Sequence, residues 1–259
     1  MISRKRYTMK KELEVITIQK RDQFIKDNLI TDQNLEMITH NMLPIETLMS
    51  YYRCAIMEVE TKFKVLNEQF SLRYDNNPIE TIKSRIKSMD GILKKIKKKD
   101  VPLSIEAIEK EIHDIAGVRV ICSFIEDVYL IANCFLKQDD ITVIEIKDYI
   151  KNPKPSGYRS LHLIIEIPIF LENEKRMMKV EVQLRTLAMD LWASQEHKLR
   201  YKKKIPESEQ EYLQKELSEV ASTLNEIDKH MEEMNKHIHS QQYHQEVKES
   251  KLNIQKLIP

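Results

Sequence analysis

The sequence predicts an α/β (α+β) protein, in which a β-sheet is flanked by helices and long helices lie towards both ends of the chain. Two observations predict this class. Apolar residues recur with a helical period near residues 44–74 and 213–238, whereas residues 101–185 change to strict alternation and to β-branched side chains. With 259 residues, of which 41% are hydrophobic and 32% charged, the chain can bury one substantial core.

The first third of the chain predicts helices. From Pro44 to about Tyr74 the apolar spacing alternates between four and three, which is one stripe of a long helix. Pro78 follows two asparagines and indicates a turn at or just beyond the end of this helix. We expect a second, lysine-rich helix over residues 79–99. Residues 8–40 have a weaker helical period.

The middle of the chain predicts the sheet. Strands are expected at 117–124, 141–149, 161–170 and 179–185, with a helix at 126–137 between the first two. Two of these strands are almost continuously apolar. Such runs indicate a sheet that helices cover on at least one face.

The last part, from Thr186, is predicted to be helical again. Its stripe keeps a four-three alternation over more than three heptads, which favours a coiled-coil seam. The residues of this stripe are Leu213, Leu217, Val220, Leu224, Ile227, Met231, Met234 and Ile238. An intramolecular hairpin and self-association both fit this pattern, and we favour a homo-oligomer. The predicted organisation is therefore a helical extension (1–44), a core domain (45–205) and a helical oligomerisation segment (206–259).

The composition excludes several classes of protein. Three glycines, against roughly 18 expected from average usage, permit neither a P-loop nor a Rossmann phosphate cradle, so cationic side chains must bind any phosphate. No run of eighteen apolar residues predicts a membrane span, and the basic start lacks the apolar run of a secretory signal. Three widely separated cysteines indicate a reduced, cytoplasmic protein.

The charges are distributed unevenly, although the net charge is only +1. Residues 83–99 contain eight Lys or Arg against one Asp, whereas residues 206–250 contain eleven Asp or Glu against four Lys. This polarity predicts that an anionic ligand binds at one place on the chain.

Polar residues on two predicted strands are candidates for chemistry. Alternation in residues 179–185 places Glu181, Gln183 and Arg185 on one face, which lines either a cleft or an open, solvated sheet face. Arg119 lies among valines and isoleucines and needs an anionic partner, either a protein carboxylate or a ligand phosphate. Asp114 and Glu181 supply two carboxylates, a donor set typical of Mg²⁺ with substrate phosphates.

A loop with two prolines and a glycine, residues 146–162, contains a tyrosine among cations. Tyr158 offers a face on which a nucleotide base can stack, and its neighbours can neutralise phosphates. The alternative is a solvated basic loop that Tyr158 attaches to the core. The polar residues concerned are Lys147, Lys151, Lys154, Tyr158, Arg159 and His162.

Two histidine patterns do not indicate metal sites. His113 and Asp114 spell the dyad of metal phosphohydrolases, but that site needs further ligands on an all-helical scaffold, and here the dyad leads into a strand. His230, His237, His239 and His244 lie on an acidic helix, where a solvated face is favoured over metal binding.

Four motifs, in this order and spacing, closely resemble the synthetase domain of RelA/SpoT-type alarmone enzymes. They are HDIAGVRVICSF, DYIKNPKPSGYRSLH, VEVQLRT and WASQEHKLRYK, and the match covers roughly residues 45–205. Without a preceding hydrolase domain, the chain is similar to small alarmone synthetases, nearer their RelP-like branch. The resemblance implies a nucleotidyltransferase-like mixed sheet, Mg²⁺ dependence and a homotetramer assembled through terminal helices. It further implies that pyrophosphate passes from ATP to the 3′-hydroxyl of GDP or GTP, giving AMP and (p)ppGpp, with no hydrolase activity.

The resemblance also implies roles for individual residues. The cations that bind ATP phosphates match Arg85, Lys87 and Lys95, and Arg119 matches an arginine packed on adenine. Asp114 matches a Mg²⁺ ligand, and Glu181 matches a carboxylate that either shares the metal or takes the 3′-hydroxyl proton. Tyr158 matches the tyrosine stacked on guanine. The remaining acceptor residues match Lys147, Lys154, His162, Gln183 and, as a polar contact to the base, Asp190.

Two departures from the family pattern are evident: Gly91 replaces a serine near the ATP phosphates, and Ser156 replaces an asparagine beside guanine. Ser156 leaves the preference between GDP and GTP open. Two further hypotheses stay open: the same chemistry on adenine nucleotides or RNA 3′ ends, and RNA binding through the lysine-rich segment.

Overall fold

A computed structural model describes residues 32–73, 77–102, 104–201, 206–238 and 241–258. The chain divides into two compact units, Met1–Leu48 and Met49–Pro259, and the second contains the entire sheet. Of the weakly periodic segment 8–40, residues up to 31 lie outside the described part, and the rest belongs to the first helix. None of the helices in the described part is long and apolar enough to cross a membrane.

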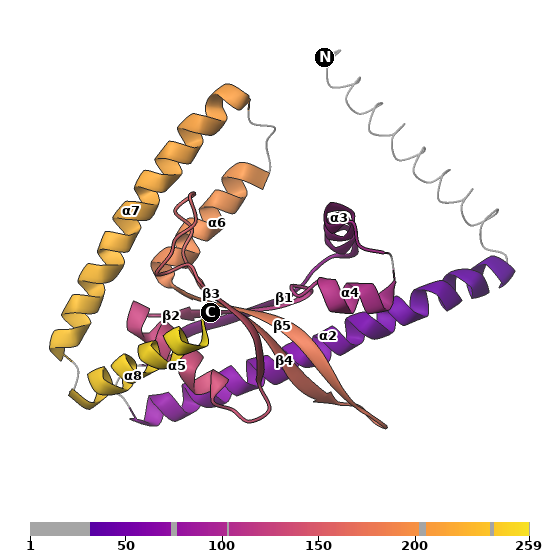
Figure 1. Cartoon of the computed structure of the whole chain (residues 1–259), viewed down its shortest axis with the longest axis horizontal. Helices are drawn as coiled ribbons and strands as arrows, with labels where there is room; N and C mark the ends of the chain where they lie inside the picture. Colours follow the sequence, from indigo (N-terminus) through magenta and orange to yellow (C-terminus); the bar gives the residue numbers. More distant parts are fainter. Residues whose placement is uncertain (1–31, 74–76, 103, 202–205, 239–240, 259) are drawn as a thin grey trace, which may run out of the picture. The chain divides into compact units, whose positions relative to one another are not determined.

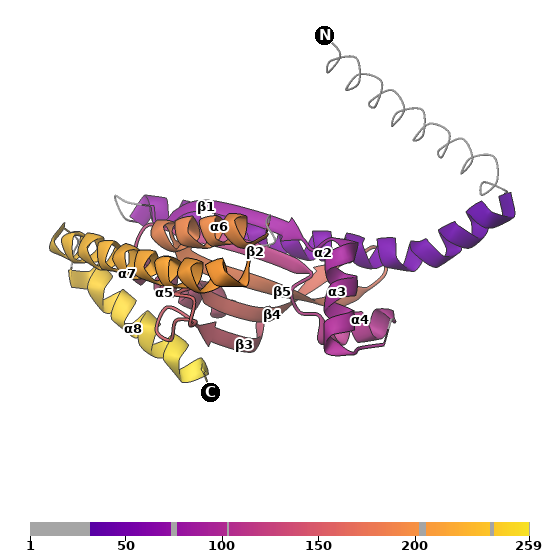
Figure 2. The same ribbon diagram turned by 90° about the horizontal axis from the view of Figure 1, so that it is seen from above.

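The second unit is built on a five-stranded mixed sheet with the strand order β1-β2-β5-β4-β3. The strands are β1 (Ile79–Ile86), β2 (Ala116–Cys122), β3 (Thr142–Asp148), β4 (Leu161–Phe170) and β5 (Lys175–Thr186). Only the central pair, β2 and β5, is parallel, and every other pair is antiparallel. Figure 2 shows the strands side by side. The sheet and its flanking helices confirm the predicted fold class.

One face of the sheet is apolar and lies against helices. Val180, Val182 and Leu184 of β5 are fully buried on this face, as alternation predicts. From residue 49 onward, helix α2 (Asp32–Arg73) lies on the same side as helix α5 (Ile125–Leu136) in Figure 1, and Phe63 stacks on Phe135 with ring centroids 4.4 Å apart. This contact makes α2 and α5 one apolar layer beneath the sheet.

The prediction of a single helix over residues 79–99 was wrong. Residues 79–86 form strand β1, which pairs with β2, and only α3 (Met89–Lys99) is helical. Apolar residues at 79, 82 and 86 imitate a helical period, but pairing along the sheet edge outweighs this weak local preference. Helix α3 then begins at Ser88, whose hydroxyl accepts a hydrogen bond from the Gly91 amide.

The first long helix also differs from the prediction, because α2 begins at Asp32 and runs through Pro44 instead of starting there. A short helix, α4 (Ile105–Glu111), precedes β2. The remaining strands and α5 agree with their predicted ranges to within a few residues at the ends.

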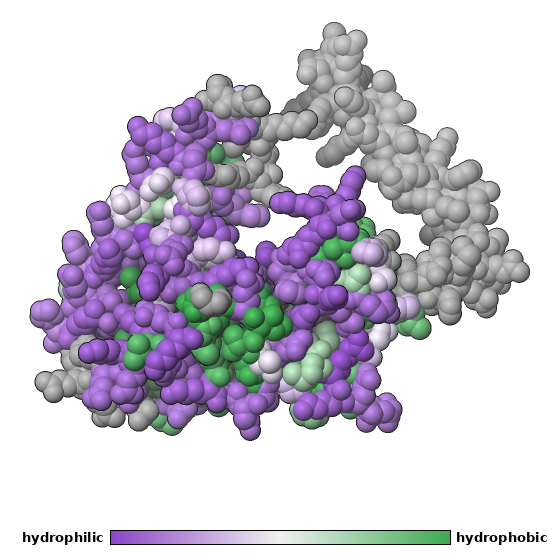
Figure 3. Space-filling view, viewed as in Figure 1, coloured by the Kyte–Doolittle hydropathy of each residue, from purple (hydrophilic) through white to green (hydrophobic). Residues whose placement is uncertain are grey.

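The C-terminal part forms three helices, α6 (Leu187–Tyr201), α7 (Glu207–Ile238) and α8 (Gln241–Leu257). Helix α7 packs on α6, and the Trp192 indole donates a 2.8 Å hydrogen bond to the Leu217 carbonyl. Helix α8 packs beside α5, where the Asn133 amide donates to the Ser250 hydroxyl at 3.1 Å. The face of the molecule seen in Figure 3 is mostly hydrophilic. Hydrophobic side chains gather near its centre, where β3 and the end of α8 lie in Figure 1.

The predicted heptad stripe of α7 divides between two environments. Leu217 is buried against α6, with Leu213 and Leu224 packed around it. In contrast, about half of the surface of each of four other members is exposed: Val220, Ile227, Met231 and Met234. The side chain of Ile238 lies outside the described part. The stripe therefore packs on α6 within the chain through some of its members and leaves the others as an exposed apolar strip.

Candidate functional site

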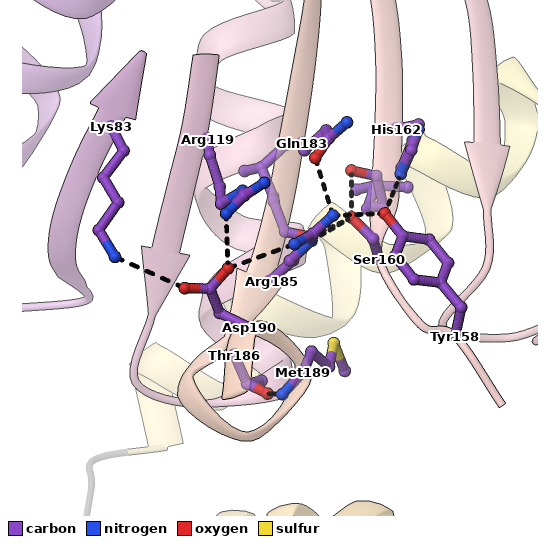
Figure 4. Close-up of polar contacts among 12 residues, drawn as sticks. Lys83, Arg119, Tyr158, Ser160, His162, Gln183, Arg185, Thr186, Met189 and Asp190 are labelled. Carbon is purple, nitrogen blue, oxygen red and sulfur yellow. Dashed lines mark hydrogen bonds and ion pairs between the residues drawn. The ribbon is translucent and has the colours of Figure 1, made fainter. Parts of the chain in front are cut away.

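A row of polar side chains crosses the sheet on the face opposite the apolar layer. Directly paired residues of neighbouring strands point to the same face of a sheet. The registers align one residue from each strand, in the order Lys83, Arg119, Gln183, His162 and Lys147. The predicted polar face of β5 thus belongs to a row that spans all five strands, and Figure 4 shows four of its members.

In the neighbouring row of paired residues, a glycine leaves space for a pocket. Arg85 of β1 lies opposite Gly117 of β2, and Gly117 is paired with Glu181 of β5. Because Gly117 has no side chain, the pocket between its neighbours stays open. The cavity has a volume of about 230 Å³ and is lined by Lys83, Ser84, Arg85, Gly117, Val118, Arg119, Glu181 and Gln183. A cleft, not an open solvated sheet, therefore explains the polar residues of β5.

Arg119 has a protein carboxylate as its partner. Its Nη1 lies 3.0 Å from Oδ1 of Asp190, a residue of α6 that is only 9% exposed. Lys83 approaches the other carboxylate oxygen at 3.6 Å. Burial, followed by repulsion from Arg185, lowers the pKa of Arg119, and Asp190 opposes this effect.

Asp114 lies between two cations, outside the lining of the pocket. Lys87 and Lys95 approach its two carboxylate oxygens at 2.8 and 2.7 Å. Burial alone would raise the pKa of Asp114, but these two lysines outweigh it and hold the pKa below its ordinary value. The neighbouring His113 contacts the Lys110 carbonyl through Nε2 at 2.8 Å.

Glu181 is held by two neighbours on the polar face. The Gln183 amide donates to Oε2 at 2.8 Å, and Nδ1 of His162 lies 3.4 Å from Oε1. Burial would raise the pKa of Glu181, but the contacts with His162 and Gln183 lower it overall. Burial also lowers the pKa of His162, although Glu181 opposes this. At neutral pH the pair therefore consists of a carboxylate and a neutral imidazole.

Tyr158 completes a chain of hydrogen bonds across this end of the face (Figure 4). Its hydroxyl is hydrogen-bonded to Nε2 of His162 at 2.7 Å and accepts from Nη2 of Arg185 at 2.5 Å. Lys154 lies over its ring, 4.9 Å from the centroid. Tyr158 is thus fixed at its hydroxyl, with a cation against its ring.

The loop before β4 packs closely against α7. Gly157 has a φ of +87°, and a Cβ built on it would lie 2.4 Å from the Cβ of Ala221. The Gln214 side chain also donates to the Pro155 carbonyl at 3.3 Å. Only glycine meets both requirements, a left-handed backbone and a close approach to a helix.

The structure therefore brings the predicted residues together in three groups: Lys87, Lys95 and Asp114; Arg119 and Asp190; and Tyr158, His162, Glu181 and Gln183. Arg85 lines the pocket between them. Lys147 lies at the end of the polar row and pairs with Glu145 at 2.8 Å.

Sequence reasoning gave no role to Arg185 or Lys83, although alternation placed Arg185 on the correct face. No signal in the sequence indicated that Asp190 is their common partner.

The described residues contain no group of three or more His, Cys, Asp and Glu side chains placed to hold a metal ion. Asp114 and Glu181 are close enough to influence each other, since Asp114 raises the pKa of Glu181. Two carboxylates match the donor set of Mg²⁺, which completes its octahedron with phosphates and water. Of the C-terminal histidines, His239 and the side chain of His244 lie outside the described part.

Replacement of Gly157 by alanine should strain the loop. A left-handed conformation costs a non-glycine residue about 1–2 kcal/mol, which corresponds to a loss of roughly 2–8 °C in Tm for a chain of this size, and the clash with Ala221 adds to it. Thermal melts should show this loss. Gly157→Ala combined with Ala221→Gly should recover only the steric part. A Gly157→Ala protein with the wild-type Tm would contradict the close packing of this loop against α7.

Comparison with known proteins identifies the relatives of this chain. The family model for the region found in RelA/SpoT proteins matches residues 84–206. GTP pyrophosphokinase YwaC of Bacillus subtilis is 47% identical over 151 residues, which cover 58% of this chain and 72% of that protein. GTP pyrophosphokinase YjbM of the same species is 38% identical over 174 residues, covering 66% and 80%.

Solved structures agree with these sequence matches. Small alarmone synthetase 2 of Bacillus subtilis superposes with a TM-score of 0.66 at 41% identity, over 74% of this chain and 98% of that one. Small alarmone synthetase 1, crystallised with its product pppGpp, gives a TM-score of 0.69 at 33% identity, over 76% and 99%. The same protein has also been crystallised with AMPCPP. The chain therefore belongs to the RelA/SpoT family, among its small alarmone synthetases.

Proposed function

We propose that this chain is a GTP pyrophosphokinase, which transfers the β,γ-pyrophosphate of ATP to the 3′-hydroxyl of GDP or GTP. AMP leaves, and ppGpp or pppGpp forms. The observation that carries this proposal is the position of Glu181, in a pocket with cations on one side and an aromatic, cationic loop on the other. The names of YwaC and YjbM support the same activity.

The ATP side of the proposed site is cationic. Arg85 and Arg119 line the pocket, and Lys87 and Lys95 meet at Asp114 beside it. A polyphosphate can take over lysine contacts that a carboxylate holds in the free chain, because both ligands offer anionic oxygens. Transfer of a phosphoryl group demands neutralised charge and alignment more than covalent chemistry.

The acceptor side is aromatic. Tyr158 would stack on guanine once Lys154 moves from its ring to the acceptor phosphates. His162 and Gln183 lie along the row that leads from Tyr158 to Glu181, and Lys147 ends it. Asp190 would orient Arg119 and, through it, the base that Arg119 contacts.

Asp114 and Glu181 would hold Mg²⁺, since each offers hard oxygen ligands, Glu181 in the pocket and Asp114 near enough to influence it. When bound, the metal supplies charge neutralisation at the transferred pyrophosphoryl group. Lys87 and Lys95 would leave Asp114 for the phosphates at that point, so that the carboxylate keeps a cationic partner throughout.

Glu181 would accept the hydrogen bond of the 3′-hydroxyl and take its proton as the new bond forms. A carboxylate with a lowered pKa is fully ionised at neutral pH, which keeps it ready to accept. The neutral His162 fixes its orientation through Oε1, and Gln183 does so through Oε2. General bases of this kind contribute about 10²–10⁴-fold to rate.

Glu181→Gln should therefore lose synthesis by about 10²–10⁴-fold and keep most of its ATP affinity, because glutamine retains the shape but cannot take a proton. Label transfer measures the first property and calorimetry the second. Glu166→Gln, on the neighbouring strand β4 and outside the pocket, is the matched control and should stay near the wild-type rate. A Glu181→Gln enzyme that retains more than about a tenth of that rate would refute the role of Glu181 as general base.

Within the family, we place the chain nearer the RelP-like branch. It is 47% identical to YwaC and 38% identical to YjbM, and YwaC represents that branch.

We also propose that segment 206–259 mediates self-association into a homotetramer. The exposed strip of α7, defined above as Val220, Ile227, Met231 and Met234, keeps heptad spacing along one side of a long helix. A second copy of the same helix fits such a strip, because each copy would bury an identical apolar surface.

Light scattering should accordingly give a mass of about four times 30.8 kDa. Ile227→Glu with Met231→Glu should reduce that mass, since charges in an apolar seam are costly. Glu226→Gln, at an exposed position of the same helix, is the control. A wild-type chain that elutes with the mass of one copy would contradict this assembly.

A further inference from the structure

Arg185 is a buried arginine that contacts residues of both proposed nucleotide subsites. Its side chain is 4% exposed. Nη1 donates to Oδ1 of Asp190 at 3.2 Å, and Nη2 donates to Oε1 of Gln183 at 2.8 Å and to the Tyr158 hydroxyl at 2.5 Å. Nε contacts the Ser160 hydroxyl at 3.4 Å. Figure 4 shows this guanidinium at the centre of the network.

On the ATP side, Arg185 acts through a shared carboxylate. Oδ1 of Asp190 accepts from Arg119 at 3.0 Å as well as from Arg185 at 3.2 Å. Two cations on one oxygen compete for it, and burial, followed by repulsion from Arg185, lowers the pKa of Arg119. Any ligand that draws Arg119 towards itself therefore leaves Asp190 more fully to Arg185.

On the acceptor side, Arg185 fixes an aromatic ring. The Tyr158 hydroxyl accepts from Arg185 and is hydrogen-bonded to His162, and the Arg185 guanidinium carbon lies 5.1 Å from the Tyr158 ring centroid. The orientation of the ring thus depends on where the guanidinium lies. His162 passes the same constraint to Glu181.

Only arginine can make these contacts together. A guanidinium presents a rigid, planar fork of five N–H donors, whereas a lysine ammonium is a point charge on a flexible chain. Lysine at this position would keep the buried positive charge but could not reach Asp190, Gln183 and Tyr158 at once. Substitution by lysine therefore separates the geometry from the charge.

We infer that Arg185 is a positioning residue that couples the two nucleotide subsites, so that the nucleotide on Arg119 strengthens binding of the nucleotide on Tyr158. This inference rests on the proposed function. By linkage, the coupling is reciprocal, and each nucleotide raises the affinity for the other by the same factor.

Calorimetry with α,β-methylene ATP and Mg²⁺ tests the coupling without turnover. The Kd of GDP is measured with and without the analogue, and the ratio of the two values is the coupling factor. For the wild type we expect a factor of about 5–150, the usual range for coupled sites. Arg185→Lys should bring the factor close to one, while each nucleotide still binds alone.

Two further variants sharpen this test. Tyr158→Phe removes one hydroxyl and keeps the ring, so it should also bring the factor close to one in a folded protein. Arg176→Lys is the matched control, because Arg176 lies on the same strand and pairs with Glu109 at 2.7 Å, away from the pocket. This control should keep the wild-type factor.

Three results would overturn the inference: a wild-type factor of one, an Arg185→Lys factor equal to the wild type, or an unchanged factor in Tyr158→Phe. In each of these cases both nucleotides bind, and the proposed function stands. A wild-type chain that binds neither nucleotide would overturn both the inference and the proposed function.

Discussion

The parallel pairing of β2 with β5 is the contact on which the site depends. Its register pairs Arg119 with Gln183 and Gly117 with Glu181. At the centre of the sheet, a row of polar side chains therefore lies beside the pocket that Gly117 leaves open. Because side chains alternate between faces, a slip of one residue would turn the polar row into the apolar layer and bury unpaired charges there. Both layers of the molecule therefore depend on one register.

Paired charges explain how such a face exists before any nucleotide arrives. Asp114 compensates Lys87 and Lys95, and Asp190 compensates Arg119 and Arg185. A buried charge without a partner would be costly, so the free chain supplies a carboxylate where the proposed reaction brings phosphate. Under the proposed function, Asp114 would then become available as a metal ligand and Asp190 as a positioning group.

Local patterns in the sequence predicted much of the fold, and the family resemblance supplied most of the candidate site residues. Alternation placed Glu181, Gln183 and Arg185 on one face correctly, since strand period is a local property. Strand β1 was missed because its apolar spacing imitates a helix and only pairing with β2 decides its form. The partner of Arg119 is Asp190, which lies 71 residues further along the chain on α6, and no local pattern reports such a contact.

The most direct test of the central claim is transfer of label from ATP carrying a labelled γ-phosphate, with Mg²⁺ and either GDP or GTP, using the purified chain. The account predicts label in guanosine tetra- or pentaphosphate, with one AMP formed for each product. Label that remains in ATP, or is released as inorganic phosphate, with both acceptors and a folded protein would contradict the proposal that this polar face is a pyrophosphate-transfer site.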